Sequence, residues 1–73
     1  METKAIEKRS INLTYVRELR QTNHYSQAKV AKVLGLNSPD KYTRRESGEY
    51  NFQADEILVL SELYKIPMER FFK

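Results

Sequence analysis

The sequence predicts an all-α fold, a compact domain of five short helices. Apolar residues recur at spacings of three and four, the period of amphipathic helices, and no segment alternates like a strand. The 73 residues include only two glycines and two prolines, so each of them helps to place a helix boundary. A chain of this length has room for one domain with a small core. We expect residues 1–11 to form a flexible N-terminal arm and residues 12–73 to form that domain.

The spacing of apolar residues predicts the first helix. Leu13, Val16 and Leu19 lie three residues apart, so they share one face of a helix over about residues 12–22.

Boundary residues predict the second helix, over about residues 27–34. Ser26 can accept hydrogen bonds from the free amides of the next turn, and Tyr25 and Val30 have the spacing of a hydrophobic staple. Gly35 ends this helix because glycine adopts the left-handed conformation at little cost.

The third helix is predicted over about residues 39–47. Pro39 suits its first turn, Ser38 is the expected cap, and Gly48 closes it. Tyr42 is its only large apolar residue, so we expect most of the helix to be polar and exposed.

The last two helices carry most of the remaining apolar residues. A strongly apolar fourth helix is predicted over about residues 53–64, and Pro67 opens a short fifth helix over about residues 67–72. The core stripe expected along the fourth helix consists of Phe52, Ile57, Leu60 and Leu63.

Composition excludes several classes of protein. With no cysteine and one histidine, the core has neither a disulfide framework nor a cysteine-rich zinc site. The longest apolar run is four residues, far short of the roughly 20 of a membrane span. The charged start is not followed by the apolar stretch of a signal peptide. We therefore expect a cytoplasmic protein with no membrane contact.

The net charge of +3 is unevenly distributed. Residues 1–45 carry ten Lys or Arg and four Asp or Glu, whereas residues 46–73 carry three and six. A positive pole favours a polyanionic partner, because phosphates that bind Lys and Arg release counterions.

The second and third helices have the spacing of a helix-turn-helix, with a small residue, Ala31, in the first and a glycine, Gly35, in the turn. Ala31 gives clearance where the helices cross. Spacing alone is not specific, because any helical hairpin can show it.

Short motifs in a fixed order add to this spacing. They are Val16–Arg20, Tyr25–Gln27, Val30–Ala31, Leu34–Leu36, Glu46–Glu49, Ile57–Ser61 and Ile66–Phe71. Residues 12–72 thereby resemble the phage-repressor and Cro type of helix-turn-helix domain, the XRE-like family with the lambda-repressor-like fold. From Gly35 to Glu46 the chain has one residue more than most members, which leaves open which residues of the third helix face the bases.

The resemblance implies a site on double-stranded DNA, with the third helix in the major groove, the second crossing the backbone, and a dimer on a palindromic operator. The expected contacts are Gln27, Ser38, Asp40, Lys41, Thr43, Arg44, Arg45, Tyr50 and Asn51. Tyr42 matches an inward position of the family. Lys41 and Arg44 are the expected base readers, because long donors reach the O6 and N7 acceptors of guanine. Arg45, Tyr50 and Asn51 are expected to contact flanking phosphates.

Other residues keep two interpretations. Thr43 could contact a thymine methyl or a phosphate, and Asp40 is favoured as a residue that stabilises the helix dipole over a cytosine reader. The cations of the third helix could also be a solvated face. Glu46 is expected to make a structural hydrogen bond or ion pair within the motif.

A cluster of large apolar residues at the C-terminus predicts a homodimer interface, formed by Met68, Phe71 and Phe72. The alternative is that Phe71 closes the core of the monomer and only Phe72 is exposed.

We predict a sequence-specific transcriptional regulator, a small phage-type or bacterial repressor. The alternative is a protein-interaction module of the same fold, which an apolar or acidic exposed face on the third helix would favour. The sequence predicts no enzyme, cofactor, metal or small-molecule ligand, because it has no cysteine, histidine pair or glycine-rich phosphate loop.

Overall fold

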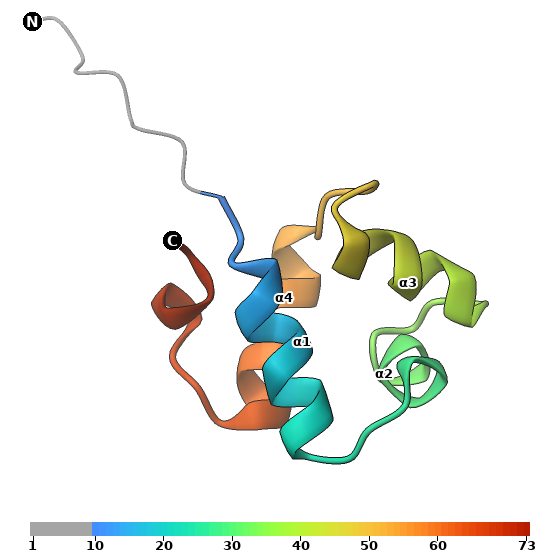
Figure 1. The fold of residues 1–73 in the computed structure, drawn as a ribbon, viewed down its shortest axis with the longest axis horizontal. Helices are drawn as coiled ribbons and strands as arrows, with labels where there is room; N and C mark the ends of the chain where they lie inside the picture. Colours follow the sequence, from blue (N-terminus) through green and yellow to red (C-terminus); the bar gives the residue numbers. More distant parts are fainter. Residues whose placement is uncertain (1–9) are drawn as a thin grey trace, which may run out of the picture.

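The computed structural model describes residues 10–73 and is all-helical, which confirms the predicted fold class (Figure 1). Its elements are α1 (Leu13–Thr22), α2 (Gln27–Val33), α3 (Pro39–Ser47), α4 (Ala54–Tyr64) and the 3₁₀ helix η1 (Met68–Phe71). The fifth helix is therefore a single 3₁₀ turn, shorter than the helix predicted over residues 67–72. None of the described helices has the length and apolar character needed to cross a membrane.

The predicted boundaries of α2 and the end of α3 are confirmed. The Ser26 hydroxyl oxygen accepts a hydrogen bond from the Lys29 amide at 3.0 Å. Gly35 and Gly48, which follow α2 and α3, have left-handed φ angles of 78° and 90°. Both glycines thus occupy conformations that other residues rarely adopt.

Ser38 is the N-cap residue of α3, as predicted, but its side chain does not cap the helix. Ser38 has an extended backbone, and its side chain makes no capping hydrogen bond. The Lys41 amide, a group that such a cap would bind, donates instead to the backbone carbonyl of Ser38 at 3.3 Å. Pro39, whose φ is fixed near the helical value, begins the helix without a side-chain cap.

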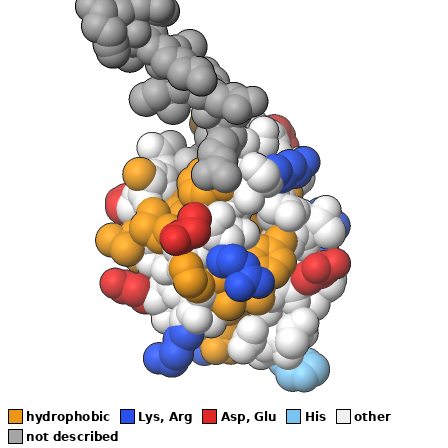
Figure 2. Space-filling view, turned by 90° about the vertical axis from the view of Figure 1, so that its left-hand side faces the viewer, with side chains coloured by type: hydrophobic (Ala, Val, Ile, Leu, Met, Phe, Trp, Pro, Cys, Tyr) orange, Lys and Arg blue, Asp and Glu red, His pale blue; other side chains and the backbone are white. Residues whose placement is uncertain are grey.

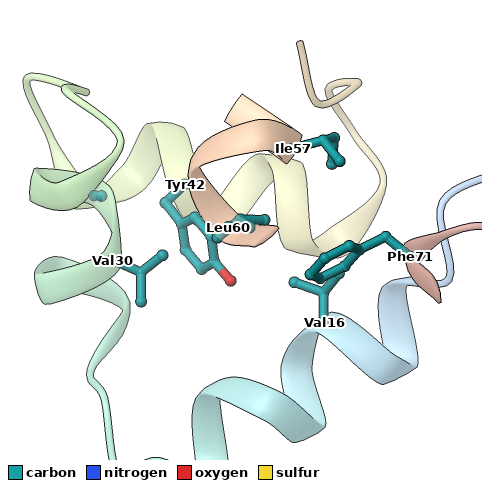
Figure 3. Packing of buried hydrophobic residues seen from close by; sticks show 7 residues of the cluster. Val16, Val30, Tyr42, Ile57, Leu60 and Phe71 are labelled. Carbon is teal, nitrogen blue, oxygen red and sulfur yellow. The ribbon is translucent and has the colours of Figure 1, made fainter. Parts of the chain in front are cut away.

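Every helix contributes at least one residue to the hydrophobic core (Figure 3). The seven buried hydrophobic residues are Val16, Val30, Ala31, Tyr42, Ile57, Leu60 and Phe71, with two each from α2 and α4. Tyr42 is fully buried, as predicted, and Ala31 is 2% exposed where α2 and α3 pack against each other. Of the stripe predicted along α4, Phe52 and Leu63 are half-buried and pack against this core.

The N-terminal boundary lies earlier than predicted. Residues 1–9 of the expected arm lie outside the described residues, but Ser10 and Ile11 are paired with the C-terminus. Ile11 forms an isolated antiparallel bridge with Phe72, and the Lys73 amide donates to the Ser10 carbonyl at 2.9 Å. The reason is the side chain of Ile11, which is half-buried against the core and holds the chain before α1 in place.

The two glycines predict different costs on substitution. We expect Gly35→Ala and Gly48→Ala each to lower the free energy of unfolding by about 1 to 2 kcal/mol, the cost of a left-handed alanine. Gly48→Ala is expected to lose more stability than Gly35→Ala, because the Cβ atom added at Gly48 would lie 3.1 Å from Leu13 Cδ1. A Cβ atom added at Gly35 would have no atom within 4 Å. Urea unfolding of both variants measures the difference, and an equal loss would contradict the close approach of Leu13.

Candidate functional site

A buried carboxylate joins the first three helices. Glu46 of α3 is 4% exposed. Its Oε2 accepts from Arg20 Nε of α1 at 2.9 Å and from the Tyr42 hydroxyl at 2.6 Å. Its Oε1 accepts from Arg20 Nη2 at 3.1 Å and from Gln27 Nε2 of α2 at 2.9 Å. The predicted structural role of Glu46 is confirmed.

The protonation states of this cluster follow from its contacts. Burial alone would raise the pKa of Glu46, but hydrogen bonds from Arg20, Tyr42 and Gln27 outweigh it and hold the pKa below the usual 4.5. Burial, followed by the hydrogen bond to Glu46, raises the pKa of Tyr42 far above 10. At neutral pH Glu46 is therefore an acceptor without a proton, and Tyr42 is a neutral donor.

The outward face of α3 carries charges of both signs. Asp40, Lys41 and Arg44 are exposed, on the side opposite the buried Tyr42 and Glu46. Arg44 Nη2 lies 3.1 Å from Asp40 Oδ2, one helical turn away. Lys41 makes no ion pair within residues 10–73, which leaves its ammonium group available to a ligand.

Two residues predicted on the exposed face of α3 are half-buried, Ser38 and Thr43. Thr43 faces α2, where its hydroxyl donates to Gln27 Oε1 at 2.8 Å. Among the residues predicted to contact DNA, the structure therefore brings Gln27 and Thr43 together.

Arg45 points away from the outward face of α3. Its side chain is 12% exposed, and its Nε lies 2.8 Å from Glu56 Oε1 at the start of α4. Its Nη1 donates to the Lys41 carbonyl at 2.8 Å, and its guanidinium lies 5.6 Å from the centroid of the Tyr50 ring. Arg45 was expected at a phosphate; the structure places it as a connection between α3 and α4. Tyr50 is 56% exposed in the loop that follows.

The predicted cluster of apolar residues at the C-terminus is divided between the core and the surface. Phe71 is fully buried, with its ring centroid 6.0 Å from that of Tyr15, so it closes the core of the monomer and is not an exposed interface residue. Met68 and Phe72 are half-buried and line a shallow depression that also includes Tyr50 and Asn51. Figure 2 shows the side of the molecule on which η1 lies, where hydrophobic side chains gather.

The role of Arg20 in binding Glu46, and that of its neighbour Arg17, were not predicted. Arg17 is 46% exposed, and its Nε lies 3.9 Å from Glu46 Oε1, which places an accessible cation beside Gln27. The signal available was two arginines three residues apart on α1, at a spacing that brings both to one face. Within residues 10–73, no group of acidic residues and histidine could hold a metal ion.

Comparison with models of known families places the chain. A model of the helix-turn-helix family, of the XRE type, matches residues 16–71, which is more than half of the chain and includes α2 and α3. No curated protein and no solved structure matches the chain.

The two arginines that approach Glu46 differ in burial and predict different effects. We expect Arg20→Ala, which leaves a buried carboxylate without its ionic partner, to lower the free energy of unfolding by about 3 to 5 kcal/mol. The matched control, Arg17→Ala, removes the same charge from a half-exposed site and should cost about 1 kcal/mol or less. Thermal unfolding monitored by circular dichroism compares the two, and similar losses would contradict the assignment of Arg20 as the main partner.

Proposed function

Because the chain belongs to the XRE-type helix-turn-helix family of DNA-binding regulators, we propose that it is a sequence-specific regulator that binds an operator in double-stranded DNA. The observation that supports sequence-specific binding is the division of α3 into two sides. Tyr42 and Glu46 are buried, whereas Lys41 and Arg44 project from the opposite side. A helix held in this way can enter the major groove with its outer side chains against base edges.

In this proposal the outward cations read bases. The lysine ammonium and the arginine guanidinium suit the O6 and N7 acceptors of guanine. Asp40 has a second effect, because its ion pair with Arg44 balances part of the positive charge and restrains the guanidinium before DNA is bound. Binding by α3 therefore depends on where the acceptors lie as well as on total charge.

Phosphate contacts would flank α3. Tyr50 and Asn51 are exposed just beyond its C-terminal end, and the exposed Arg17 of α1 lies 3.9 Å from Glu46 of α3. Arg45 contributes by supporting the Tyr50 ring and by joining α3 to α4. Such contacts set the orientation of α3 in the groove without carrying sequence information.

We propose that two copies act together and repress transcription by occupying the operator. Met68 and Phe72 would form the contact between copies, because both remain partly exposed beside Tyr50 and Asn51. The proposed dimer surface and the proposed phosphate contacts therefore adjoin. A two-fold dimer binds two half-sites separated by one turn of DNA, about 34–36 Å.

Selection from a random duplex library tests the function itself. We expect enrichment of a palindromic site whose affinity falls steeply between 50 and 200 mM salt. The fall is expected because the release of counterions from DNA favours binding less as the salt concentration rises. A site without two-fold symmetry would contradict the dimer. No enrichment, with weak binding to every duplex, would contradict specific DNA recognition and favour a protein partner.

Arg44→Ala tests base reading. We expect it to weaken binding to the selected site by about 5- to 150-fold and to relax the preference at one base pair, because one side chain reads one or two bases. The matched control, Arg70→Ala, removes an exposed arginine of η1 and should leave the base preference unchanged. Quantitative binding to single-base variants of the site measures both, and an unchanged preference in Arg44→Ala would remove its assignment as a reader.

A further inference from the structure

Thr43, Gln27 and Glu46 form a chain of hydrogen bonds between α3 and α2. We infer that Thr43 is a positioning residue: through this chain it holds Gln27, which the family resemblance already places at the DNA, with an amide donor directed to a phosphate oxygen. The inference rests on the proposed DNA binding. In this role Thr43 donates its hydroxyl proton to Gln27 and not to a base or a phosphate.

The direction of the chain is set by Glu46. A carboxylate without a proton can only accept hydrogen bonds, so the amide nitrogen of Gln27 must face it, at 2.9 Å. With the amide in this orientation, Gln27 Oε1 is directed to Thr43, whose hydroxyl donates to it at 2.8 Å. The reversed amide would place its oxygen against the carboxylate, where two acceptors repel each other.

The same chain determines what each side chain offers to a ligand. Gln27 Nε2 carries two protons, and Glu46 takes one of them; the other has no acceptor within residues 10–73. Thr43 has a single hydroxyl proton with two acceptors in reach, Gln27 Oε1 at 2.8 Å and the Pro39 carbonyl at 3.2 Å. Gln27 therefore offers a donor, whereas Thr43 offers only oxygen lone pairs and a methyl group.

A phosphate oxygen accepts hydrogen bonds and does not donate them, so it fits Gln27. It does not fit Thr43, whose proton would have to leave both of its acceptors to reach a phosphate. Holding a flexible glutamine in its binding orientation before DNA arrives also lowers the entropy lost on binding. Thr43 therefore favours DNA binding through Gln27, and its effect should be the same for every sequence.

Thr43→Val and Thr43→Ser test the chain on DNA. Valine has nearly the shape of threonine but no hydroxyl, whereas serine keeps the hydroxyl. We expect Thr43→Val to weaken binding to the selected site and to unrelated duplexes alike, by about 2- to 12-fold, the usual effect of one hydrogen bond. Thr43→Ser should bind as the unaltered protein does. In a Gln27→Ala background, Thr43→Val should have no further effect.

Two results on DNA would overturn the inference. One is a changed preference at a single base pair in Thr43→Val, which would make Thr43 a base reader. The other is an equal loss in the Gln27→Ala background, which would show that Thr43 acts without Gln27. The melting temperature of each variant, measured in parallel, separates loss of folding from loss of the contact, and Thr43→Ser provides a folded reference.

The side-chain amide of Gln27 reports on the chain in the absence of DNA. In nuclear magnetic resonance spectra we expect its two protons to be further apart in chemical shift than those of the exposed Gln21, because Glu46 binds only one of them. This difference should shrink in Thr43→Val but not in Thr43→Ser. A Gln27 amide in the unaltered protein whose two protons are no further apart than those of Gln21 would overturn the chain even if DNA binding is found. Conversely, an intact amide signature with no DNA binding by the unaltered protein would contradict the proposed function and the phosphate contact together, and would leave the chain as a structural feature.

Discussion

The carboxylate of Glu46 is buried where α1, α2 and α3 meet, and the cost of removing it from water must be offset by donors from the protein. One donor comes from each helix: Arg20 from α1, Gln27 from α2 and Tyr42 from α3. If one helix shifts, a donor is lost and the carboxylate remains without it, at a cost that a purely apolar contact would not impose. The interaction therefore determines the relative positions of the three helices more than it adds to stability.

This constraint explains how so polar a helix as α3 can be held firmly. Tyr42 is its only large apolar residue, so hydrophobic burial gives it a single anchor. The Glu46 cluster on the inner side and the Arg45–Glu56 pair toward α4 supply two more, both of them ionic. Because these contacts use the inner and lateral sides, the remaining side of α3 is left free of structural tasks. That side is the one with which the proposed regulator would contact DNA.

Local patterns predicted the parts of the structure that depend on local physics. The spacing of apolar residues indicated the helices, and Gly35 and Gly48 marked the ends of α2 and α3, because a left-handed residue is a requirement of the backbone alone. The orientations of Thr43 and Arg45 could not be predicted in this way. Their partners, Gln27 and Glu56, lie 16 and 11 residues away in the sequence and come close only after folding. Phe71 was uncertain for the same reason, since its burial depends on the position of α1.

Arg44 and Arg45 show how much depends on position within a helix. They are identical and adjacent, but successive residues of an α-helix point about 100° apart, so only one of them can face outward. Arg45 donates a hydrogen bond to Glu56. The Glu56 carboxylate also accepts a hydrogen bond from the backbone amide of Gln53 at 2.9 Å and so fixes the start of α4. Through this contact α3 is joined to the start of α4, where Ala54 and Ile57 line the same depression as Tyr50, Met68 and Phe72. In the proposed dimer, the spacing between the two copies of α3 would depend on the Arg45–Glu56 contact. If α3 could move relative to α4, the dimer could not hold the two copies of α3 one turn of DNA apart.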